Sequence, residues 1–456
     1  MNKNKEILNL VDGRKLDKTQ FLAVTTRRKN VLVLAGAGCG KTLTIVARVR
    51  YLINYLKIEA SEILCLSFTN DAVNKLKEDL NINGVDVMTF HKLSLKIIGR
   101  KKEVLTENML RPIIENTFCN DALFGVFGLN KEEMYGVVES FISVFKARNY
   151  NLDDFSKFIS RADAGDKALL KEIMKCYVCY EAYLNKENLV DFNDMINLAI
   201  KALDGHYSSS YKHVIIDEYQ DVSYTKYLLI KMLQKKTNAS VFAVGDDFQS
   251  IYRFSGSEVK LITNFRYYFS FAKVYKLKNT YRNSKQLVNV AGRFIMRNKR
   301  QVRKCLRSDI SIDNPVNVIW YDDLLSSMLK IIKTDKLDNI FVLGRNNDDV
   351  KSVVLNNVNY QKMTVHRSKG LQADYVFVVG LTDFKNGFPN KFTDHKILKY
   401  VNDNKEYYPY EEERRLFYVA LTRCIKKVYL FVPRKNPSLF VKELLKQYKN
   451  VVIREK

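Results

Sequence analysis

Residues 31–42 read VLVLAGAGCGKT, and this stretch decides how the N-terminal part of the chain folds. Its branched apolar residues predict a buried strand, and the pattern TLTIVARVRYLINYL that follows predicts a helix. The glycine-rich turn between them matches the motif that wraps backbone N–H groups around phosphate. The alternative is an ordinary glycine-rich turn. The residues that would line the phosphate site are Ala35, Gly36, Ala37, Gly38, Cys39, Gly40, Lys41 and Thr42.

Two acids further along the chain would complete a nucleotide site. VIIDEYQD (214–221) begins with an apolar run, so Asp217 and Glu218 would follow a strand, where α/β sheets place ligands. Lys41 would meet the β- and γ-phosphates, and Thr42 with Asp217 would hold Mg²⁺. Glu218 would take the proton from the attacking water. Acids at strand ends are also common helix N-caps, so the assignment depends on the phosphate loop.

Hydrolysis also needs positive charge where negative charge develops on the γ-phosphate. Arg282 in NTYRNS and Arg423 in VALTRC are candidates far down the chain. Each could instead be an ordinary surface arginine. The phosphate loop itself departs from the strict pattern at Ala35, where glycine is expected. The strand and helix on either side still favour a phosphate site.

Several short apolar runs that end at glycine or an acid have the composition of buried parallel strands. Helical patterns separate these runs, which is the order of a doubly wound α/β sheet. The runs are VLVLAG (31–36), ILCLSF (63–68), HVIIDE (213–218), VFAVGDD (241–247), FVLGR (341–345) and YVFVVG (375–380).

The same patterns divide the chain into two α/β domains in tandem. Residues 96–190 show helical periodicity and no strand-like run, so we interpret them as an all-helical insertion. The first α/β domain would comprise residues 1–95 and 191–270. The second would comprise residues 271–456.

The charge of the chain points to a polyanionic partner. Its 456 residues include 75 Lys and Arg against 50 Asp and Glu, a formal charge of +25, which favours nucleic acid over membrane. The alternative is a lysine-rich solubilising surface. RNKRQVRKCLR (297–307) holds six basic residues in eleven and is either a solvated helix face or a strip that follows phosphates.

The sequence favours a cytoplasmic protein without a membrane partner. The seven cysteines have no framework spacing, which indicates a reducing compartment. Cys176 and Cys179 form a lone C-x-x-C inside a helical pattern, better interpreted as packed cysteines than as a metal or redox pair. Residues 1–15 lack an apolar signal core, and no apolar run is long enough to span a bilayer.

Nine motifs occur in the order of a known family. The chain resembles the UvrD/Rep type of superfamily 1 DNA helicases nearly end to end, which implies two RecA-like domains with ATP in the cleft between them. Besides AGAGCGKT and DEYQD, the motifs are LDKTQFLAV (16–24), SFTNDAVNKL (67–76), MTFHKL (88–93), VGDDFQSIYRFSG (244–256), NTYR (279–282), TVHRSKGLQADYVFVVGL (364–381) and YEEERRLFYVALTR (410–423).

The resemblance implies further roles in the ATP site. Gln20 would hydrogen-bond the adenine and Tyr281 would stack on it. Gln249 would sense the γ-phosphate, and Arg282 with Arg423 would be the finger arginines. Gln372 stands near the expected ribose position, where relatives have glutamate.

The resemblance also implies a face that binds single-stranded DNA. Aromatic rings there would stack on bases, which is sequence-tolerant, and hydroxyl, amide and imidazole groups would contact the strand. The residues are Phe68, Thr69, Asn70, Thr89, His91, Tyr252, Phe254, Thr364 and His366. Any one aromatic taken alone would more often belong to a core.

Some positions depart from the family pattern. Leu43 replaces an arginine that packs on adenine in relatives, and Thr280 replaces asparagine. Only a short segment near residues 346–362 lies where relatives insert the accessory 2B domain, so we expect that domain to be absent or minimal.

The sequence leaves four hypotheses for the function of the chain. The first is an ATP- and Mg²⁺-dependent translocase on single-stranded DNA that unwinds tailed duplexes, with 3′–5′ polarity by resemblance, in repair, replication or defence. The second is a DNA-stimulated motor subunit of a nuclease-containing repair or antiphage complex. The third is a nucleic-acid-binding scaffold without ATPase activity, which the intact ATPase motifs disfavour. The fourth is an RNA motor.

Overall fold

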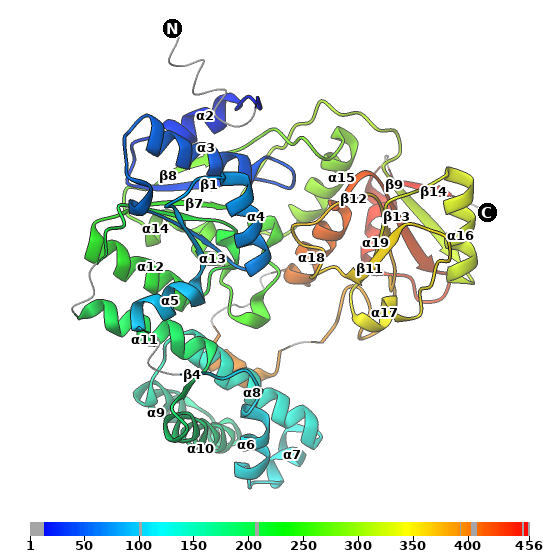
Figure 1. Ribbon diagram of the computed structural model, residues 1–456. Helices are drawn as coiled ribbons and strands as arrows, with labels where there is room; N and C mark the ends of the chain where they lie inside the picture. The colour runs from blue at the N-terminus through cyan, green and yellow to red at the C-terminus, as the bar shows by residue number, and fades with distance from the viewer. Residues whose placement is uncertain are drawn as a thin grey trace.

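The computed structural model describes residues 13–99, 103–205, 209–392, 394–402, 408–448 and 451–454. Two α/β bodies lie side by side, and a helical body extends below the first of them (Figure 1). The interpretation of the extreme N-terminus as leader-free falls mainly on residues 1–12, which lie outside the described residues. Within the described residues, no helix is both long and apolar enough to cross a membrane.

The first α/β domain is built on a six-stranded parallel sheet. Its strand order is β3-β2-β6-β7-β1-β8. The strands are β1 (Asn30–Leu34), β2 (Ile63–Ser67), β3 (Asp86–Thr89), β6 (His213–Ile216), β7 (Ser240–Gly245) and β8 (Lys273–Lys276).

Helices cover both faces of this sheet because its strands are apolar on both faces. On β1, Val31 and Val33 face one core, while Leu32 and Leu34 face the other. The first face is covered by α2 (Lys18–Thr25), α3 (Lys41–Asn54) and α4 (Asn70–Leu80); the second is covered by α5 (Phe90–Ile98), α11 (Phe192–Asp204), α12 (Tyr224–Thr237), α13 (Val259–Thr263) and α14 (Phe265–Tyr268).

The insertion has its own core, around Phe141, Phe145 and Phe155. Two-residue strands, which the sequence did not predict, pair in parallel at its two ends. The insertion comprises β4 (Glu103–Val104), α6 (Leu110–Thr117), α7 (Ala122–Phe127), α8 (Lys131–Ala147), α9 (Leu152–Arg161), α10 (Ala164–Lys186) and β5 (Leu189–Val190).

The second α/β domain is a parallel sheet of order β11-β10-β12-β13-β9-β14. Helices α15, α18 and α19 pack on one face, and α16 and α17 on the other. The elements are α15 (Lys285–Ile295), β9 (Val316–Tyr321), α16 (Leu324–Asp335), β10 (Ile340–Gly344), α17 (Asn347–Lys351), β11 (Tyr360–Thr364), β12 (Ala373–Val378), α18 (Glu411–Leu421), β13 (Cys424–Pro433), α19 (Leu439–Gln447) and β14 (Val451–Arg454).

The expected α/β fold with two parallel sheets is confirmed, but the boundary at residue 270 is too early. β8 (Lys273–Lys276) pairs with β1 and completes the first sheet, although the sequence placed it in the second domain. The lysines at its two ends obscured the strand, and they are tolerated because β8 lies at the edge of the sheet.

Two connections carry the second domain back onto other parts of the molecule. After α15, residues 297–307 return to the first domain, and we call this segment the strap. Between β12 and α18, a segment carrying the 3₁₀ helix η5 (Lys396–Tyr400) reaches the helical insertion, and we call residues 381–402 the arm (Figure 1). Between β10 and β11 the chain runs only through α17 and a short loop.

Candidate nucleotide site and nucleic-acid interface

The phosphate loop joins β1 to α3 as the sequence predicts. Gly38 and Gly40 have φ angles of 71° and 75°, a left-handed conformation that strains other residues. A side chain on Gly38 would also collide with Arg282, whose Cβ atom would lie 2.5 Å away. Ala35 is buried and is not among the residues with positive φ, so alanine is tolerated where the strict motif has glycine.

Lys41 and the first-domain acids meet at the loop. Lys41 Nζ lies 2.7 Å from each carboxylate oxygen of Glu218. Burial opposes the charge on Lys41, but Glu218 and then Asp217 outweigh this effect and raise the pKa of Lys41. Burial, followed by the Glu218 charge, raises the pKa of Asp217. A buried acid beside a carboxylate gains from a bound cation.

Glu218 is held in a strained backbone conformation. Its φ of 49° is left-handed, which costs a non-glycine residue energy and is found most often at functional sites. Burial disfavours its charge, yet Lys41 and then Lys369 lower its pKa. Glu218 is therefore ionised, with Lys41 as its partner.

Two arginines from the second-domain side reach the same site without matching anions. Arg423 Nη2 donates to Gln249 Oε1 at 3.0 Å. Burial, and then the neighbouring Arg282 guanidinium, lower the pKa of Arg423 to about 9. Among the described residues, no acceptor binds the buried Nε atoms of Arg282 and Arg423. Two like charges with unpaired donors form a site that fits a polyanion.

Gln249 lies at the centre of this contact between domains. Its side-chain amide donates to Asp246 at 2.6 Å while its carbonyl oxygen accepts from Arg423. Lys369 of the second domain donates to the Gln249 backbone carbonyl at 2.7 Å and to Asp221 at 2.6 Å. Gln249 thus connects the end of strand β7 to two cations of the other domain.

The expected adenine side combines Gln20 and Asp17 of the first domain with Tyr281 and Gln372 from the second-domain side. The Gln20 amide donates to the loop carbonyl of Cys39 at 3.2 Å, and its oxygen caps α2 through the Asp17 N–H. The Tyr281 ring is exposed, and its hydroxyl donates to Asp17 at 3.4 Å. Gln372 is exposed beside Leu371, whose carbonyl accepts from Arg423. The adenine and ribose roles stay predictions.

The donor set fits Mg²⁺ bound together with a nucleotide. Within the described part of the chain, no group of three or more His, Cys, Asp or Glu residues could hold a metal by itself. Mg²⁺ usually takes only one or two protein oxygens and completes its shell with phosphates and water. The Thr42 hydroxyl in the first turn of α3 and the Asp217 carboxylate would supply those oxygens.

The predicted base-stacking rings gather on one face between the domains. Phe68 and Tyr252 stack with ring centroids 5.4 Å apart, and Tyr252 contacts Phe254 edge-on at 5.9 Å. His366 of the second domain lies 5.8 Å from Phe254, whose side chain is 70% exposed. An exposed ring supported by half-buried ones is suited to stacking on a base.

The predicted hydroxyl contacts also serve the fold. Thr69 and Thr89 are the N-caps of α4 and α5, so their side chains bind helix N–H groups. Asn70 is exposed at the start of α4, and Thr364 ends β11 beside His366. These DNA contacts remain predictions, because the capping of α4 and α5 by itself explains why threonine stands at these two positions.

The histidines on this face are neutral. Burial, and then Lys226, lowers the pKa of His91 to about 4. Burial, and then Arg345, lowers the pKa of His366 to about 4. Neutral rings would bind a strand by hydrogen bonding or stacking, while phosphate charge would have to be met by lysine and arginine.

Several residues of the site were missed from sequence. Lys369 lies in the HRSKG motif, but nothing in the motif indicated its contacts with Gln249 and Asp221. Arg253, next to the aromatic rings, binds Glu412 at 2.8 Å across the domains. Arg415 donates to the Ser250 carbonyl at 2.6 Å. All of these are contacts between domains, which leave no periodic signal in the sequence.

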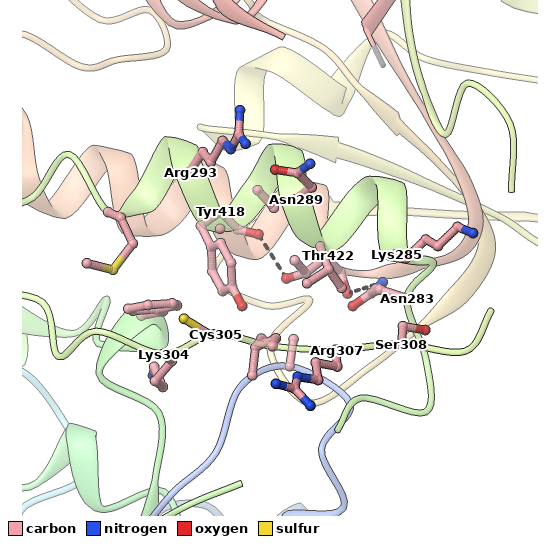
Figure 2. A pocket seen from close by; sticks show the side chains of 17 residues that line it. Asn283, Lys285, Asn289, Arg293, Lys304, Cys305, Arg307, Ser308, Tyr418 and Thr422 are labelled. Atoms are coloured by element: carbon pink, nitrogen blue, oxygen red, sulfur yellow. Dashed lines mark hydrogen bonds between the residues drawn. The ribbon is translucent and has the colours of Figure 1, made fainter. Parts of the chain in front are cut away.

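The strap, residues 297–307, does not form a helix. Lys304 is buried and Leu306 packs on Gly36, whereas Arg303 and Arg307 are exposed. A contact of these exposed arginines with phosphates stays a prediction. A cavity of about 500 Å³ lies between the strap, α15, α18 and the phosphate loop (Figure 2).

On α10, Cys176 is buried and Cys179 is exposed, so only Cys176 packs as expected.

Fold and site together define a phosphate-loop motor ATPase with two RecA-like domains. The UvrD/REP helicase N-terminal domain matches residues 16–270, and the UvrD-like helicase C-terminal domain matches residues 335–435. The chain belongs to the UvrD/Rep family, whose enzyme class is the ATP-dependent DNA helicases.

Individual relatives differ in how much of their length the chain covers. DNA helicase IV of Escherichia coli (strain K12) is 30% identical over 96% of this chain and 71% of its own length. A probable DNA helicase of Mycoplasma pneumoniae is 26% identical over 95% of this chain and 87% of its own length. PcrA of Bacillus subtilis is 26% identical, and the match covers 42% of it. The chain spans about half the length of the Rep and PcrA relatives.

Proposed function

We propose that the protein is an ATP- and Mg²⁺-dependent translocase on single-stranded DNA that unwinds tailed duplexes with 3′–5′ polarity. One observation carries this proposal. Gln249 contacts Arg423 of the other domain, and three residues later Tyr252 enters the aromatic face with Phe68 and His366. A change in the cleft therefore has a covalent path of a few residues to the DNA face.

The chemistry would begin with an exchange of partners at Lys41. ATP phosphates would replace Glu218 as the partner of Lys41, and this would free the Glu218 carboxylate to orient and deprotonate the attacking water. Bound Mg²⁺ would neutralise phosphate charge. Arg282 and Arg423 would turn their unpaired donors to the γ-phosphate, where developing charge needs them.

Charge on the γ-phosphate would also close the cleft. An anion held on the phosphate loop would attract Arg282 and Arg423 from the second-domain side and so favour closure, and its loss would favour opening because the two like charges would again lack a counter-ion. Each cycle would then move η4 (Arg253–Ser255), which carries Phe254, relative to His366 on the second domain. A repeated opening of this kind can step a strand past stacked rings.

Two assays test the proposal. ATPase activity should rise with single-stranded DNA and disappear in Lys41→Ala, and duplexes with 3′ tails should open while those with 5′ tails do not. Absence of DNA stimulation in the wild-type protein would refute the motor. Stimulation without unwinding would instead support a motor subunit that acts inside a nuclease-containing complex, and stimulation by RNA alone would indicate an RNA motor.

The short connection between β10 and β11 bears on the unwinding assay. Residues 345–359 hold only α17 and short loops, which supports the expectation that an accessory domain is absent or minimal there. Duplex opening would then depend on the two α/β domains, the helical insertion and the arm. A role in DNA repair, replication or defence and a cytoplasmic location are consistent with this enzyme class and remain proposals.

A further inference from the structure

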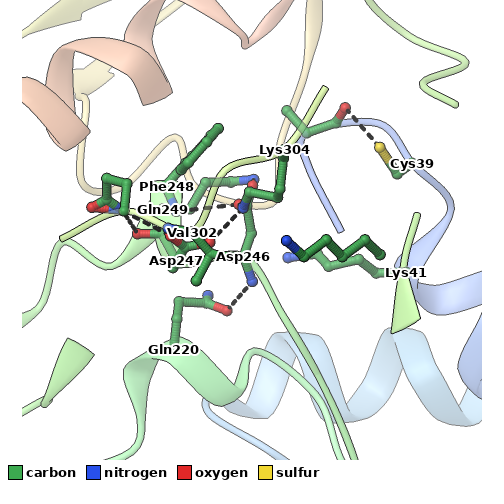
Figure 3. A network of polar contacts seen from close by, with 12 residues as sticks. Cys39, Lys41, Gln220, Asp246, Asp247, Phe248, Gln249, Val302 and Lys304 are labelled. Atoms are coloured by element: carbon green, nitrogen blue, oxygen red, sulfur yellow. Dashed lines mark hydrogen bonds and ion pairs between the residues drawn. The ribbon is translucent and has the colours of Figure 1, made fainter. Parts of the chain in front are cut away.

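Lys304 is a buried cation held by two buried acids. Its ammonium group binds the carboxylates of Asp246 and of Asp247, the latter at 2.6 Å, and all three side chains are at most 1% exposed (Figure 3). It also lies 3.7 Å from the centroid of the Phe248 ring. Burial opposes its charge, but Asp246 and Asp247 raise its pKa, so Lys304 stays protonated.

Lys304 reaches this position from the second-domain side of the chain. The strap leaves α15, which packs on α18 of the second domain, and enters the first domain. Gln301 donates to Asp247 at 3.0 Å, and the Val302 N–H donates to it at 2.8 Å. The Arg307 N–H donates to the Lys278 carbonyl at 2.7 Å. The strap is therefore anchored on both sides of Lys304.

A continuous set of polar contacts runs from Lys304 to the finger arginine. Lys304 binds one oxygen of Asp246, and the other oxygen accepts from the Gln249 amide at 2.6 Å. Because that amide is occupied, the Gln249 carbonyl oxygen points to Arg423. The orientation of the Gln249 side-chain amide thus depends on which groups donate hydrogen bonds to Asp246. Without Lys304, two adjacent buried carboxylates would lack their counter-ion, and one would take up a proton or turn away.

We infer that Lys304 is a positioning residue for ATP hydrolysis: it fixes Asp246, which holds the Gln249 amide, so that the Gln249 carbonyl oxygen faces Arg423. Lys304 does not touch the expected phosphate positions and acts through Gln249. The inference rests on the proposed ATPase function. It assigns to the basic strap a task that neither a solvated face nor a phosphate strip would have.

The test is a double-mutant cycle in ATP hydrolysis at saturating DNA. Lys304→Met should lower kcat about 10-fold or more and change KM for ATP by less than about threefold, because ground-state binding groups are kept. Gln249→Ala should lower kcat similarly, and the double variant should be no slower than Gln249→Ala. Lys299→Met, an exposed lysine of the same strap, is the matched control and should behave as wild type.

A second background separates positioning from folding. Asp247→Asn removes one acid, so Lys304→Met in that background leaves the same net charge as the wild-type cluster while Asp246 remains. This protein should fold and should recover most of the lost kcat. Lys304→Met with wild-type kcat would overturn the inference, as would multiplication of the Lys304→Met and Gln249→Ala effects on kcat when Asp247 is intact. A wild-type protein with no ATPase activity would instead refute the proposed function.

Discussion

At the scale of single residues, Glu218 combines a left-handed backbone with a salt bridge to Lys41. In the proposed ATPase, Lys41 would bind either Glu218 or phosphate, so the carboxylate would compete with the nucleotide. We predict that Glu218→Gln lowers kcat by at least about 100-fold, the usual contribution of a general base. It should leave nucleotide affinity equal or several-fold tighter, since neutral glutamine holds Lys41 less strongly.

This prediction is checked by single-turnover hydrolysis together with equilibrium binding of a fluorescent ATP analogue. Lys41→Ala is the opposing control, because it should lose binding as well as hydrolysis. A Glu218→Gln protein that binds nucleotide much more weakly than wild type would mean that the salt bridge organises the loop instead of competing with phosphate.

His366 gives the second domain a defined response to acid. Its pKa is about 4 in the fold against 6.5 for an ordinary histidine. The unfolded chain therefore binds the proton first, and the stabilising difference, complete above pH 6.5, is lost as the pH falls toward 4. At pH 5 the loss is on the order of 1–2 kcal/mol from this residue.

His366→Gln should weaken that dependence. Urea unfolding followed at pH 7 and pH 5 should show a smaller fall in stability for the variant than for the wild type. His91, with the same low pKa in the first domain, is left intact and keeps its own share of the acid response. Equal falls for both proteins would mean that His366 is protonated in the fold at pH 5.

At the scale of elements, 3₁₀ helices η3 (Asp247–Gln249) and η4 (Arg253–Ser255) connect the two sites. Gln249 faces Arg423, while Phe254 lies on the aromatic face. We predict that Gln249→Ala mainly lowers kcat and its stimulation by DNA. Phe254→Ala should mainly weaken DNA binding, by about 1–3 kcal/mol for one stacked base.

The two effects are measured on the same preparations, as ATPase rates with and without DNA and as affinity for a fluorescent oligonucleotide. Tyr267→Ala, which removes another exposed ring of the first domain, is the matched control for Phe254. If both variants lose only DNA binding and keep DNA-independent hydrolysis, Gln249 does not sense the phosphate.

The strands that the sequence predicted are all interior strands of their sheets, although the interior strands β9 and β13 were not predicted. VLVLAG and YVFVVG contain unbroken apolar runs because β1 and β12 have helices above and below and strands on both sides. β8 and β11 escaped prediction because they lie at sheet edges, where lysine and glutamine are tolerated. An edge strand has one neighbour and more contact with solvent, so it can carry polar residues. Its sequence then lacks the unbroken apolar run that identifies a buried strand.

The candidate site also contains contacts that the sequence could predict and contacts that it could not. Lys41, Asp217 and Glu218 follow strands at fixed spacing, so their meeting could be predicted from the α/β pattern. The contacts of Lys304 and Lys369 depend on how one domain packs on the other. Motif order placed Gln249 and Arg423 in the same site, but only the packing of the domains gives their hydrogen bond.

At the scale of the whole molecule, the arm ties the second domain to the helical insertion. Ile397 and Val401 are fully buried in the core of the insertion, although they belong to the second half of the chain. Lys399 binds the buried Asp166 of α10 at 2.6 Å, and Lys396 binds it at 3.2 Å. The insertion is therefore held by the second domain as well as by the first domain, which carries it.

Removing the apolar part of this contact should loosen the insertion without affecting the nucleotide site. Ile397→Ala should cost about 2–4 kcal/mol locally, the usual range for a buried isoleucine, and should raise hydrogen exchange in α8 and α10 before it changes β1 or α3. Ile310→Ala, at an exposed isoleucine, is the matched control. Because Asp166 is fully buried, a freed arm would leave its charge unpaired, so exchange should rise most around Asp166. Exchange in α10 that matches the control would mean that the insertion is stable without the arm, and that the second domain moves independently of it.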